Sequence, residues 1–196
     1  QAGFMVYTDR AQFLSDAADA GLTTTNEDLD SPGPGDPFTI DDLNGNSVEF
    51  DVLDGGFGGN GIAGGIGDVK LASNSVTGSV VGIGFDSIYI FGGGFSSLQR
   101  LALNGGDAVL NTFGNSGNNV SFLGLLSTDG TLITSVDDIT LEYEPTNHFS
   151  RLDNLVIVTG SVEEVPEPSS LALLGMGGIG MVGYRWRRKR KAKLSA

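Results

Sequence analysis

The sequence predicts a mainly β protein: an antiparallel two-sheet sandwich or jelly roll with one short N-terminal helix, plus a C-terminal transmembrane helix. Roughly ten short segments rich in β-branched and aromatic residues, separated by turn signals, favour the sandwich. Glycine is abundant, at 31 of 196 residues, which is typical of a turn-rich chain. A long uncharged apolar stretch directly before a basic C-terminus favours the membrane segment.

The only helical pattern of the body follows an apolar run at residues 4–7. Thr8 is the candidate N-cap, and Asp9 would lie in the first turn, where the helix dipole favours it. Apolar residues follow at helical spacing, namely Ala11, Leu14, Ala17 and Ala18. Gly21 then ends the helix as a glycine in the left-handed conformation.

After residue 21 the chain is predicted to form strands. We expect them at 22–29, 38–40, 47–53, 80–86, 87–91, 98–103, 108–113, 120–126, 132–136, 139–143 and 154–158. Asn44-Gly45 and Asn104-Gly105 each predict a tight hairpin turn. The glycine-rich stretch 54–68 is predicted to be a surface loop. No second core is visible, so residues 1–160 form one β-sandwich ectodomain.

Charge and composition exclude several functions. Residues 1–165 hold 23 of the 24 acidic residues but only four of the eleven basic ones, which is a formal charge of −19. Such an acidic body repels phosphates, so nucleic acid is not expected as a partner. Cysteine is absent and His148 is the only histidine, which removes thiolate chemistry and histidine metal sites. The chain is therefore predicted not to be an enzyme.

The C-terminal residues are expected to form three parts: a linker at 161–168, a transmembrane segment at 169–184 and a basic cytoplasmic tail at 185–196. As a helix the membrane segment would span about 24 Å, less than the ~30 Å hydrocarbon core, so local thinning or snorkelling is needed. The basic cluster that places the tail in the cytoplasm is Arg185, Arg187, Arg188, Lys189, Arg190 and Lys191. A buried water-soluble helix is the alternative, and its five glycines disfavour it.

Three features of this terminus together resemble the PEP-CTERM sorting signal of Gram-negative bacteria. They are Pro166-Glu167-Pro168, the glycine-rich apolar stretch and the basic cluster, in that order. The resemblance implies export, a membrane exosortase as a partner, and passage through the inner membrane to the envelope, cell surface or extracellular matrix. The chain begins with Gln1 and no leader, so we expect a mature chain whose signal peptide has been removed.

Segments of the body are similar to a jelly-roll domain common in proteins with this tail. They are residues 6–13 (V-Y-T-D-R-A-Q-F), 27–30 (E-D-L-D), 122–125 (F-L-G-L), 133–136 (I-T-S-V) and 149–155 (F-S-R-L-D-N-L). The resemblance implies the jelly-roll architecture. Carbohydrate-binding modules share that architecture, but a fold alone does not establish a function.

The body's acidic turns are candidates for a calcium site. Calcium takes six to eight oxygen ligands from loops, and Asp137, Asp138 and Asp153 are the best candidates. Adjacent aspartates on a strand point to opposite faces, so Asp137 and Asp138 cannot chelate one ion alone. The alternatives are that these are solvated turn residues, or that Asp153 satisfies backbone groups at the start of the last strand. No other cofactor is expected.

The expected function is that of an exported, non-enzymatic surface or matrix protein with exopolysaccharide as its candidate ligand. One alternative is a calcium-dependent glycan-binding module, which predicts an exposed aromatic strip to which Tyr89, Phe57 or Phe95 could belong. The other is a glycoside hydrolase, which predicts two carboxylates facing each other across a cleft.

Overall fold

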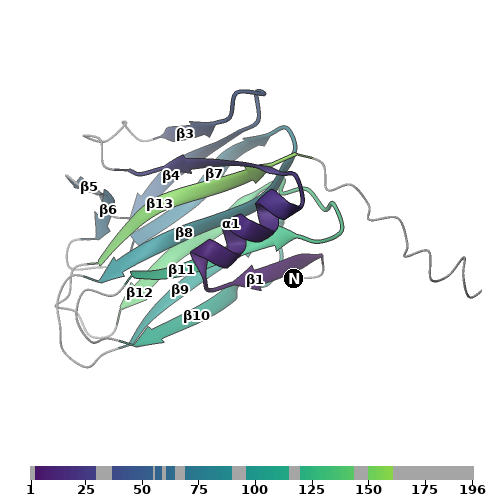
Figure 1. Ribbon diagram of the computed structural model, residues 1–196. Helices are drawn as coiled ribbons and strands as arrows, with labels where there is room; N and C mark the ends of the chain where they lie inside the picture. The colour runs from purple at the N-terminus through teal and green to yellow at the C-terminus, as the bar shows by residue number, and fades with distance from the viewer. Residues whose placement is uncertain are drawn as a thin grey trace, which may run out of the picture. The chain divides into compact units, whose positions relative to one another are not determined.

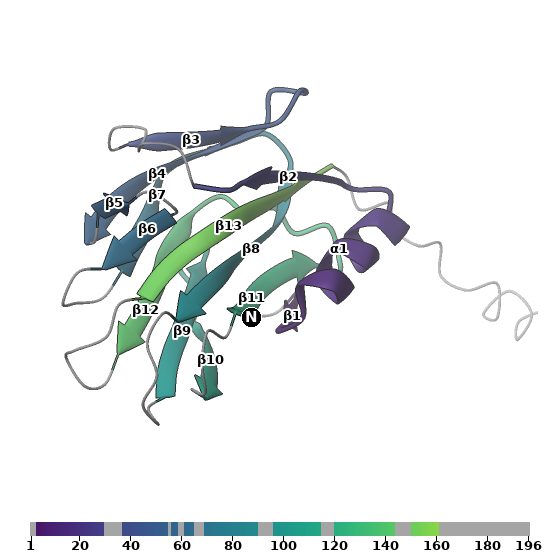
Figure 2. The same ribbon diagram turned by 60° about the vertical axis from the view of Figure 1, so that its left-hand side comes forward.

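Two antiparallel sheets pack face to face, with one helix on the outside, in the computed structural model of the chain (Figures 1 and 2). The structure describes residues 3–29, 37–54, 56–58, 61–64, 69–89, 96–114, 120–143 and 150–160. Residues 1–162 form one unit, which contains all of these elements. The predicted fold class is confirmed for the body: it is mainly β, with two sheets and one helix.

The first sheet, sheet A, has the strand order β1-β11-β8-β13-β6-β5, and β2 also pairs with β13. Its strands are β1 (Phe4–Tyr7), β2 (Thr23–Glu27), β5 (Gly56–Gly58), β6 (Gly61–Gly64), β8 (Val80–Tyr89), β11 (Val120–Ser127) and β13 (Ser150–Thr159). Along one side β13 pairs with β8. Along its other side it pairs first with β6, over 150–152, and then with β2, over 155–159. The sheet is therefore split beside residues 153 and 154.

The second sheet, sheet B, has the order β10-β9-β12-β7-β4-β3. Its strands are β3 (Phe38–Asp41), β4 (Ser47–Asp54), β7 (Val69–Thr77), β9 (Ser96–Leu103), β10 (Val109–Gly114) and β12 (Val136–Tyr143). Both predicted hairpins are confirmed, because Asn44-Gly45 joins β3 to β4 and Asn104-Gly105 lies between β9 and β10. Gly45 and Gly105 have φ of 82° and 67°, which glycine adopts without strain.

The main core lies between the sheets and follows from the two-residue period of the strands. On β12, for example, Ile139 and Leu141 are fully buried, whereas Glu142 is half-exposed. Phe38 and Phe50 stack across the β3–β4 hairpin, with ring centroids 5.3 Å apart. The apolar inner faces of both sheets thus supply the burial that stabilises the sandwich.

The helix α1 (Arg10–Asp19) covers the outer face of sheet A, where a second apolar cluster forms (Figure 1). Phe13 and Ala17 are fully buried there, and the Phe13 and Phe122 rings lie 5.2 Å apart. The sheet can accommodate these rings because Gly84 and Gly124 leave room for them. A Cβ on Gly124 would lie 2.7 Å from Phe122 and 3.0 Å from Phe13.

The ends of α1 differ in part from the prediction. Asp9, not Thr8, is the N-cap: its backbone is extended and its carboxylate accepts a hydrogen bond from the Gln12 amide at 3.0 Å. A carboxylate at this position also favours the helix dipole. The C-terminal prediction is confirmed, because Gly21 has φ of 71° and the Leu22 amide donates to the Ala17 carbonyl at 2.9 Å.

The strand assignment made from the sequence needs four corrections. The predicted strand at 132–136 is wrong, because the Asn104 side chain, rather than a neighbouring strand, accepts the amide protons of Thr134 and Ser135. The segments 80–86 and 87–89 belong to the single strand β8, and the rest of the second predicted segment, 90–91, lies outside the described residues. Strand β7 was not predicted, because its outward residues are polar and resemble a loop. The glycine-rich stretch 54–68 contains the paired strands β5 and β6 rather than only a loop.

Candidate functional site

The predicted sorting residues lie outside the described part of the chain. These are Pro166-Glu167-Pro168 and the basic cluster at 185–191, as well as the predicted membrane segment 169–184. Within the described ranges, no helix is long and apolar enough to cross a membrane. The candidate site must therefore be sought on the sandwich, beginning with the aspartates that the sequence singled out.

The register of β12 shifts between Val136 and Asp138, so the strand period that the sequence analysis used does not hold at Asp137 and Asp138; Val136 and Ile139 are buried, whereas Asp137 is exposed and Asp138 is half-buried. Asp137 accepts hydrogen bonds from the Gly105 amide at 2.5 Å and from the Ser135 hydroxyl at 2.8 Å, which ties β12 to the β9–β10 turn. Asp138 lies 2.6 Å from Nε of Arg100 and also accepts a hydrogen bond from the Thr140 hydroxyl. Each carboxylate is thus engaged by protein groups.

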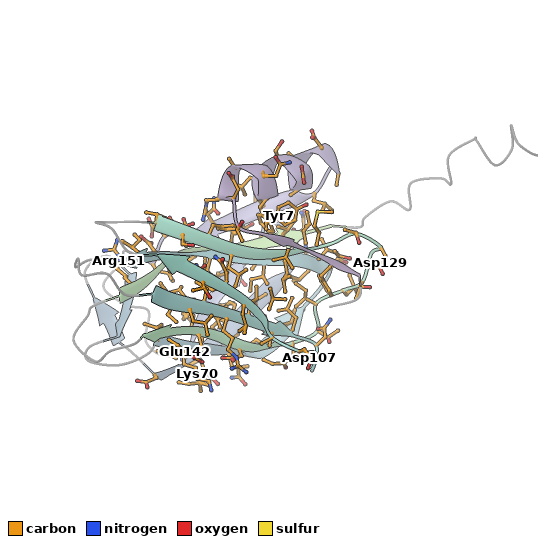
Figure 3. All side chains as sticks on the ribbon, turned by 90° about the horizontal axis from the view of Figure 1, so that it is seen from below. Tyr7, Lys70, Asp107, Asp129, Glu142 and Arg151 are labelled. Atoms are coloured by element: carbon orange, nitrogen blue, oxygen red, sulfur yellow. The ribbon has the colours of Figure 1, made fainter. Side chains whose placement is uncertain are left out.

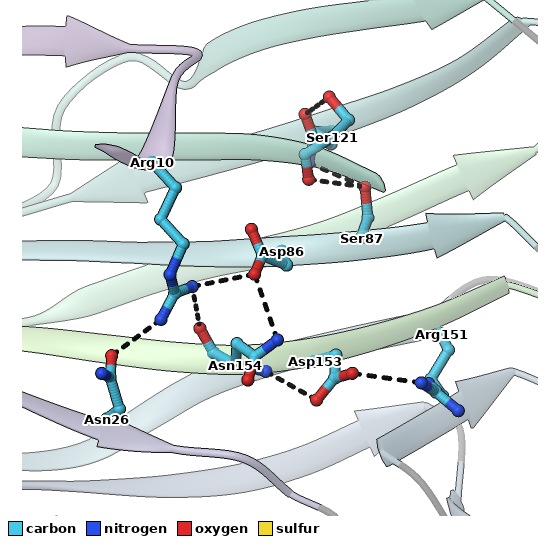
Figure 4. Close-up of polar contacts among 9 residues, drawn as sticks. Arg10, Asn26, Asp86, Ser87, Ser121, Arg151, Asp153 and Asn154 are labelled. Atoms are coloured by element: carbon cyan, nitrogen blue, oxygen red, sulfur yellow. Dashed lines mark hydrogen bonds and ion pairs between the residues drawn. The ribbon is translucent and has the colours of Figure 1, made fainter. Parts of the chain in front are cut away.

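Asp153 lies on the other sheet, in a group that we call the Arg10 cluster (Figure 4). Its members are Arg10, Asn26, Asp86, Arg151, Asp153 and Asn154. The Arg10 guanidinium donates to Asp86 at 2.9 Å and to the side chain of Asn26 at 2.8 Å. Asp153 accepts from Arg151 at 3.1 Å and from the backbone amide of Asn154 at 2.8 Å.

The position of the Arg10 cluster follows from the split in sheet A. The register of β13 against β8 shifts between Asp153 and Val156, and Asn154 has φ of 45°. At this bulge the Asn154 carbonyl accepts a hydrogen bond from Arg10 at 2.9 Å. Arg10 therefore supplies a hydrogen-bond donor to a backbone carbonyl at the split, where β13 changes its partner from β6 to β2. Its bond to Asn26 also ties the first turn of α1 to the end of β2.

Asp86 and Asp153 are opposite each other in the β8–β13 register, and they are only 5% and 6% exposed. Burial raises the pKa of Asp86, and the neighbouring Asp153 charge adds to this, whereas the Arg10 charge acts in the opposite direction. Each carboxylate has its own arginine, at 2.9 and 3.1 Å. A pair of glycosidase carboxylates would be open to substrate, whereas these two are buried and each is paired with an arginine. The arrangement is therefore that of a structural network, which holds α1 on the sheet.

A second buried network, which the sequence analysis missed, lies on the inner face of sheet A. The Gln99 amide of sheet B donates to the Ser87 hydroxyl at 2.8 Å and to the Ser121 carbonyl at 3.1 Å, so it bridges the two sheets. The side-chain amide of Asn111 donates to the side-chain oxygen Oε1 of Gln99 at 2.6 Å. Figure 4 shows Ser87 and Ser121 on their neighbouring strands. The sequence did contain a signal for this network. Gln99, Leu101 and Leu103 alternate along one strand, so the two-residue period places the Gln99 side chain on the same inner face as the two leucines.

The outer face of sheet B carries a polar surface away from α1; we call it the open face and define it by Lys70, Arg100, Asp138, Thr140 and Glu142. The strand register places Arg100, Thr140 and Lys70 side by side on β9, β12 and β7. Arg100 and Glu142 are 42% and 43% exposed and their charged groups lie 3.8 Å apart. Figure 3 shows Lys70 and Glu142 on the opposite side of the sandwich from Tyr7 and α1.

The structure does not gather the three predicted calcium ligands, since Asp137 and Asp138 lie on sheet B and Asp153 on sheet A. Among the described residues, no group of three or more acidic or histidine side chains could hold a metal ion. The aromatic side chains with a described placement are all buried or half-buried. The side chains of Tyr89, Phe57 and Phe95 lie outside this description.

Comparison with known proteins decides the nature of the C-terminus. The PEP-CTERM protein-sorting motif matches residues 164–189. The chain carries a PEP-CTERM sorting motif. The motif implies export, processing by an exosortase, and sorting to the cell envelope or surface. A search of curated proteins found no match to the chain.

The body is similar to solved carbohydrate-binding modules. A family 29 module is 19% identical, with a TM-score of 0.37, and the match covers 76% of this chain and 97% of that one. The module TmCBM61, in complex with β-1,4-galactotriose, is 8% identical, with a TM-score of 0.35 and coverage of 81% and 90%. The family 11 module of Clostridium thermocellum, in complex with a mixed-linked tetrasaccharide, is 9% identical, with a TM-score of 0.27 and coverage of 84% and 92%. Similarity this low gives no information on a ligand for this chain.

Proposed function

We propose that the chain is a non-enzymatic protein of the cell surface or extracellular matrix, delivered by its sorting motif, whose sandwich binds a neutral exopolysaccharide through the open face. The sorting motif at 164–189 is the observation that carries the export and surface part. During transit the apolar stretch would span the inner membrane with the basic cluster in the cytoplasm. An exosortase would then process the chain near Pro166.

The chemistry of the open face supports the glycan part. Lys70 and Arg100 offer donors, and Asp138 and Glu142 offer acceptors, on the wide outer surface of one sheet. Neighbouring donors and acceptors of this kind match the hydroxyl groups of a sugar chain, each of which both donates and accepts. The formal charge of −19 over residues 1–165 repels a polyanion, so a neutral polysaccharide is the favoured class.

The paired state of the buried carboxylates supports a non-enzymatic role. Asp86 and Asp153 are the opposed acidic pair of sheet A, and arginines hold both. If the purified body nonetheless releases reducing ends from a polysaccharide with saturable kinetics, this part of the proposal is wrong. Glycoside hydrolysis would then become the leading function.

Delivery is tested with the full chain in a bacterium that has an exosortase. The intact chain should reach the cell surface in a shortened form, as measured by surface labelling and immunoblotting. A chain that lacks residues 164–189 should remain unprocessed, and so should the intact chain in a strain without exosortase. Equal surface delivery of all three would contradict the role of the motif.

Glycan binding is tested with residues 1–162, which contain both apolar clusters and so carry their own core. In affinity electrophoresis, neutral matrix polysaccharide should retard the body and a polyuronate should not. Lys70→Ala and Glu142→Ala should each weaken binding by roughly tenfold or more, since hydrogen bonds to charged groups contribute about 1.5–3 kcal/mol. Asp19→Ala, on the exposed side of α1, is the control and should bind normally.

Repeating this assay in EDTA and then in excess Ca²⁺ distinguishes the calcium-dependent alternative. Binding through the open face alone should be the same in both. Binding that needs calcium, or that survives both open-face substitutions, would place the ligand elsewhere on the molecule.

A further inference from the structure

Both sheets end in an uncharged strand on the same side of the sandwich. Strand β1 closes sheet A and pairs only with β11 among the described strands, and β10 closes sheet B and pairs only with β9. Their sequences, FMVY and VLNTFG, contain no charged residue and no proline. Figures 1 and 2 both show β1 and β10 along the same lower side. We call these two strands the paired edge.

The paired edge is also apolar at the surface. Met5 is 49% exposed on β1, and Leu110 is 55% exposed on β10. Val6, next to Met5 on β1, is also 45% exposed. Free edges are normally protected from strand addition by lysine, proline or an inward charge. Neither strand of the paired edge has such protection, although the body is rich in charge elsewhere.

We propose that the paired edge joins two copies of this chain around a twofold axis perpendicular to the sheets. Such an axis reverses strand direction, so β1 would pair antiparallel with β1 of the second copy, and β10 with its own equivalent, in the same step. A second copy is the occupant because it presents two free edges at the same sheet spacing and in the same order. Each sheet would then continue through both copies.

The charge distribution supports this choice of contact. Two bodies of residues 1–162, with four basic and 21 acidic residues and so a formal charge of −17 each, repel one another, and a contact between uncharged strands avoids placing like charges face to face. A cationic partner would instead be attracted to the acidic surfaces. The dimer should therefore become tighter as salt screens the repulsion between the bodies, whereas a contact built on ion pairs would weaken.

The test is sedimentation velocity of residues 1–162 at concentrations up to about 100 µM. The unmodified body should sediment as a dimer, with a larger dimer fraction at ~0.5 M than at ~0.05 M salt. Met5→Lys and Leu110→Lys should each shift it to monomer by placing like charges across the axis. Leu43→Lys is the matched control, because Leu43 is fully exposed at the β3–β4 turn, away from the paired edge.

Three outcomes would overturn the proposal. They are a monomer at every concentration and salt, a dimer that persists in both edge variants, and a dimer that Leu43→Lys disrupts as strongly. The midpoint of thermal unfolding, extrapolated to low concentration, must match for all four proteins, so that loss of the dimer is not loss of the fold. None of these results depends on glycan binding, which is measured separately.

Discussion

Replacing Arg10 by methionine should destabilise the sandwich far more than the loss of a surface residue. The guanidinium makes three contacts of 2.8–2.9 Å, to Asp86, to the Asn154 carbonyl and to Asn26. Its side chain is 24% exposed, but the side chain of Asp86 is only 7% exposed. Methionine removes the guanidinium, which also lies 5.8 Å from the Phe122 ring centroid, and leaves the Asp86 carboxylate buried opposite Asp153 with no arginine beside it.

The expected loss is about 2–4 kcal/mol at neutral pH. Breaking a fully buried ion pair costs about 3–5 kcal/mol, and partial exposure of Arg10 reduces this toward the lower end. For a domain of this size the unfolding midpoint should fall by roughly 5–12 °C. Urea unfolding of residues 1–162, with and without the substitution, measures the loss directly.

The loss should shrink in acid. Burial raises the pKa of Asp86 in the folded state above its value in the unfolded state. Protonation of Asp86 therefore stabilises the fold at a pH below the unfolded pKa, and this stabilisation is lost as pH rises through the folded pKa. Without Arg10 the folded pKa rises further. The difference between the two proteins should thus be smaller near about pH 4 than at pH 7. Growth of the difference toward acid would refute the reasoning.

A double-mutant cycle isolates the charge. With Asp86→Asn as the background, Arg10→Met should cost clearly less, because no buried charge is left without a partner. A loss below about 1 kcal/mol in the original background, the amount typical of exposed ion pairs, would show that Arg10 does not support the split in sheet A.

Three further outcomes are expected for residues 1–162. Gly84→Ala should lower the free energy of unfolding by about 1–3 kcal/mol, because the new Cβ would overlap Phe122. Near-UV circular dichroism should show that the environment of the aromatic rings is disturbed. Unchanged stability would contradict the packing described. Gln99→Ala should cost about 1–3 kcal/mol in urea unfolding, because it removes the bridge between the sheets. Hydrogen bonds from Thr159 and neighbouring groups lower the pKa of Asp42 in the folded state, so the ionised carboxylate stabilises the fold above its unfolded pKa and this stabilisation is lost as pH falls below about 4. Asp42→Ala should therefore flatten the pH dependence of the unfolding midpoint in that range. An unchanged pH profile would show that the contact is not formed.

Local patterns in the sequence were sufficient to predict the class of the body. Short segments rich in β-branched and aromatic residues between turn signals predicted the strands, the Asn-Gly pairs predicted two hairpins, and Gly21 predicted the end of the helix. Each of these depends on a few adjacent residues and on backbone conformations that glycine or asparagine favours. The C-terminal motif could be read for the same reason, since its three features are contiguous in the chain.

The predictions that failed concern groups whose partners are distant in sequence. The strand expected at 132–136 depended on local β propensity, but the Asn104 side chain satisfies its backbone from a separate hairpin. Strand β7 has few apolar residues and is held by β4 and β12 on either side. Propensity is too weak to resist such tertiary contacts, so these segments could not be assigned locally.

By itself, the sequence determined the export signal, the acidic character of the body and the β-sandwich class, because composition, charge and short-range periodicity are properties of neighbouring residues. Only the tertiary structure decided which polar groups meet. Arg10 reaches Asp86 across 76 positions and Asn154 across 144, and the edges β1 and β10 come to the same side through strand order alone. Sheet topology is set by the burial of many weak contacts at once, and no single segment of the chain encodes it.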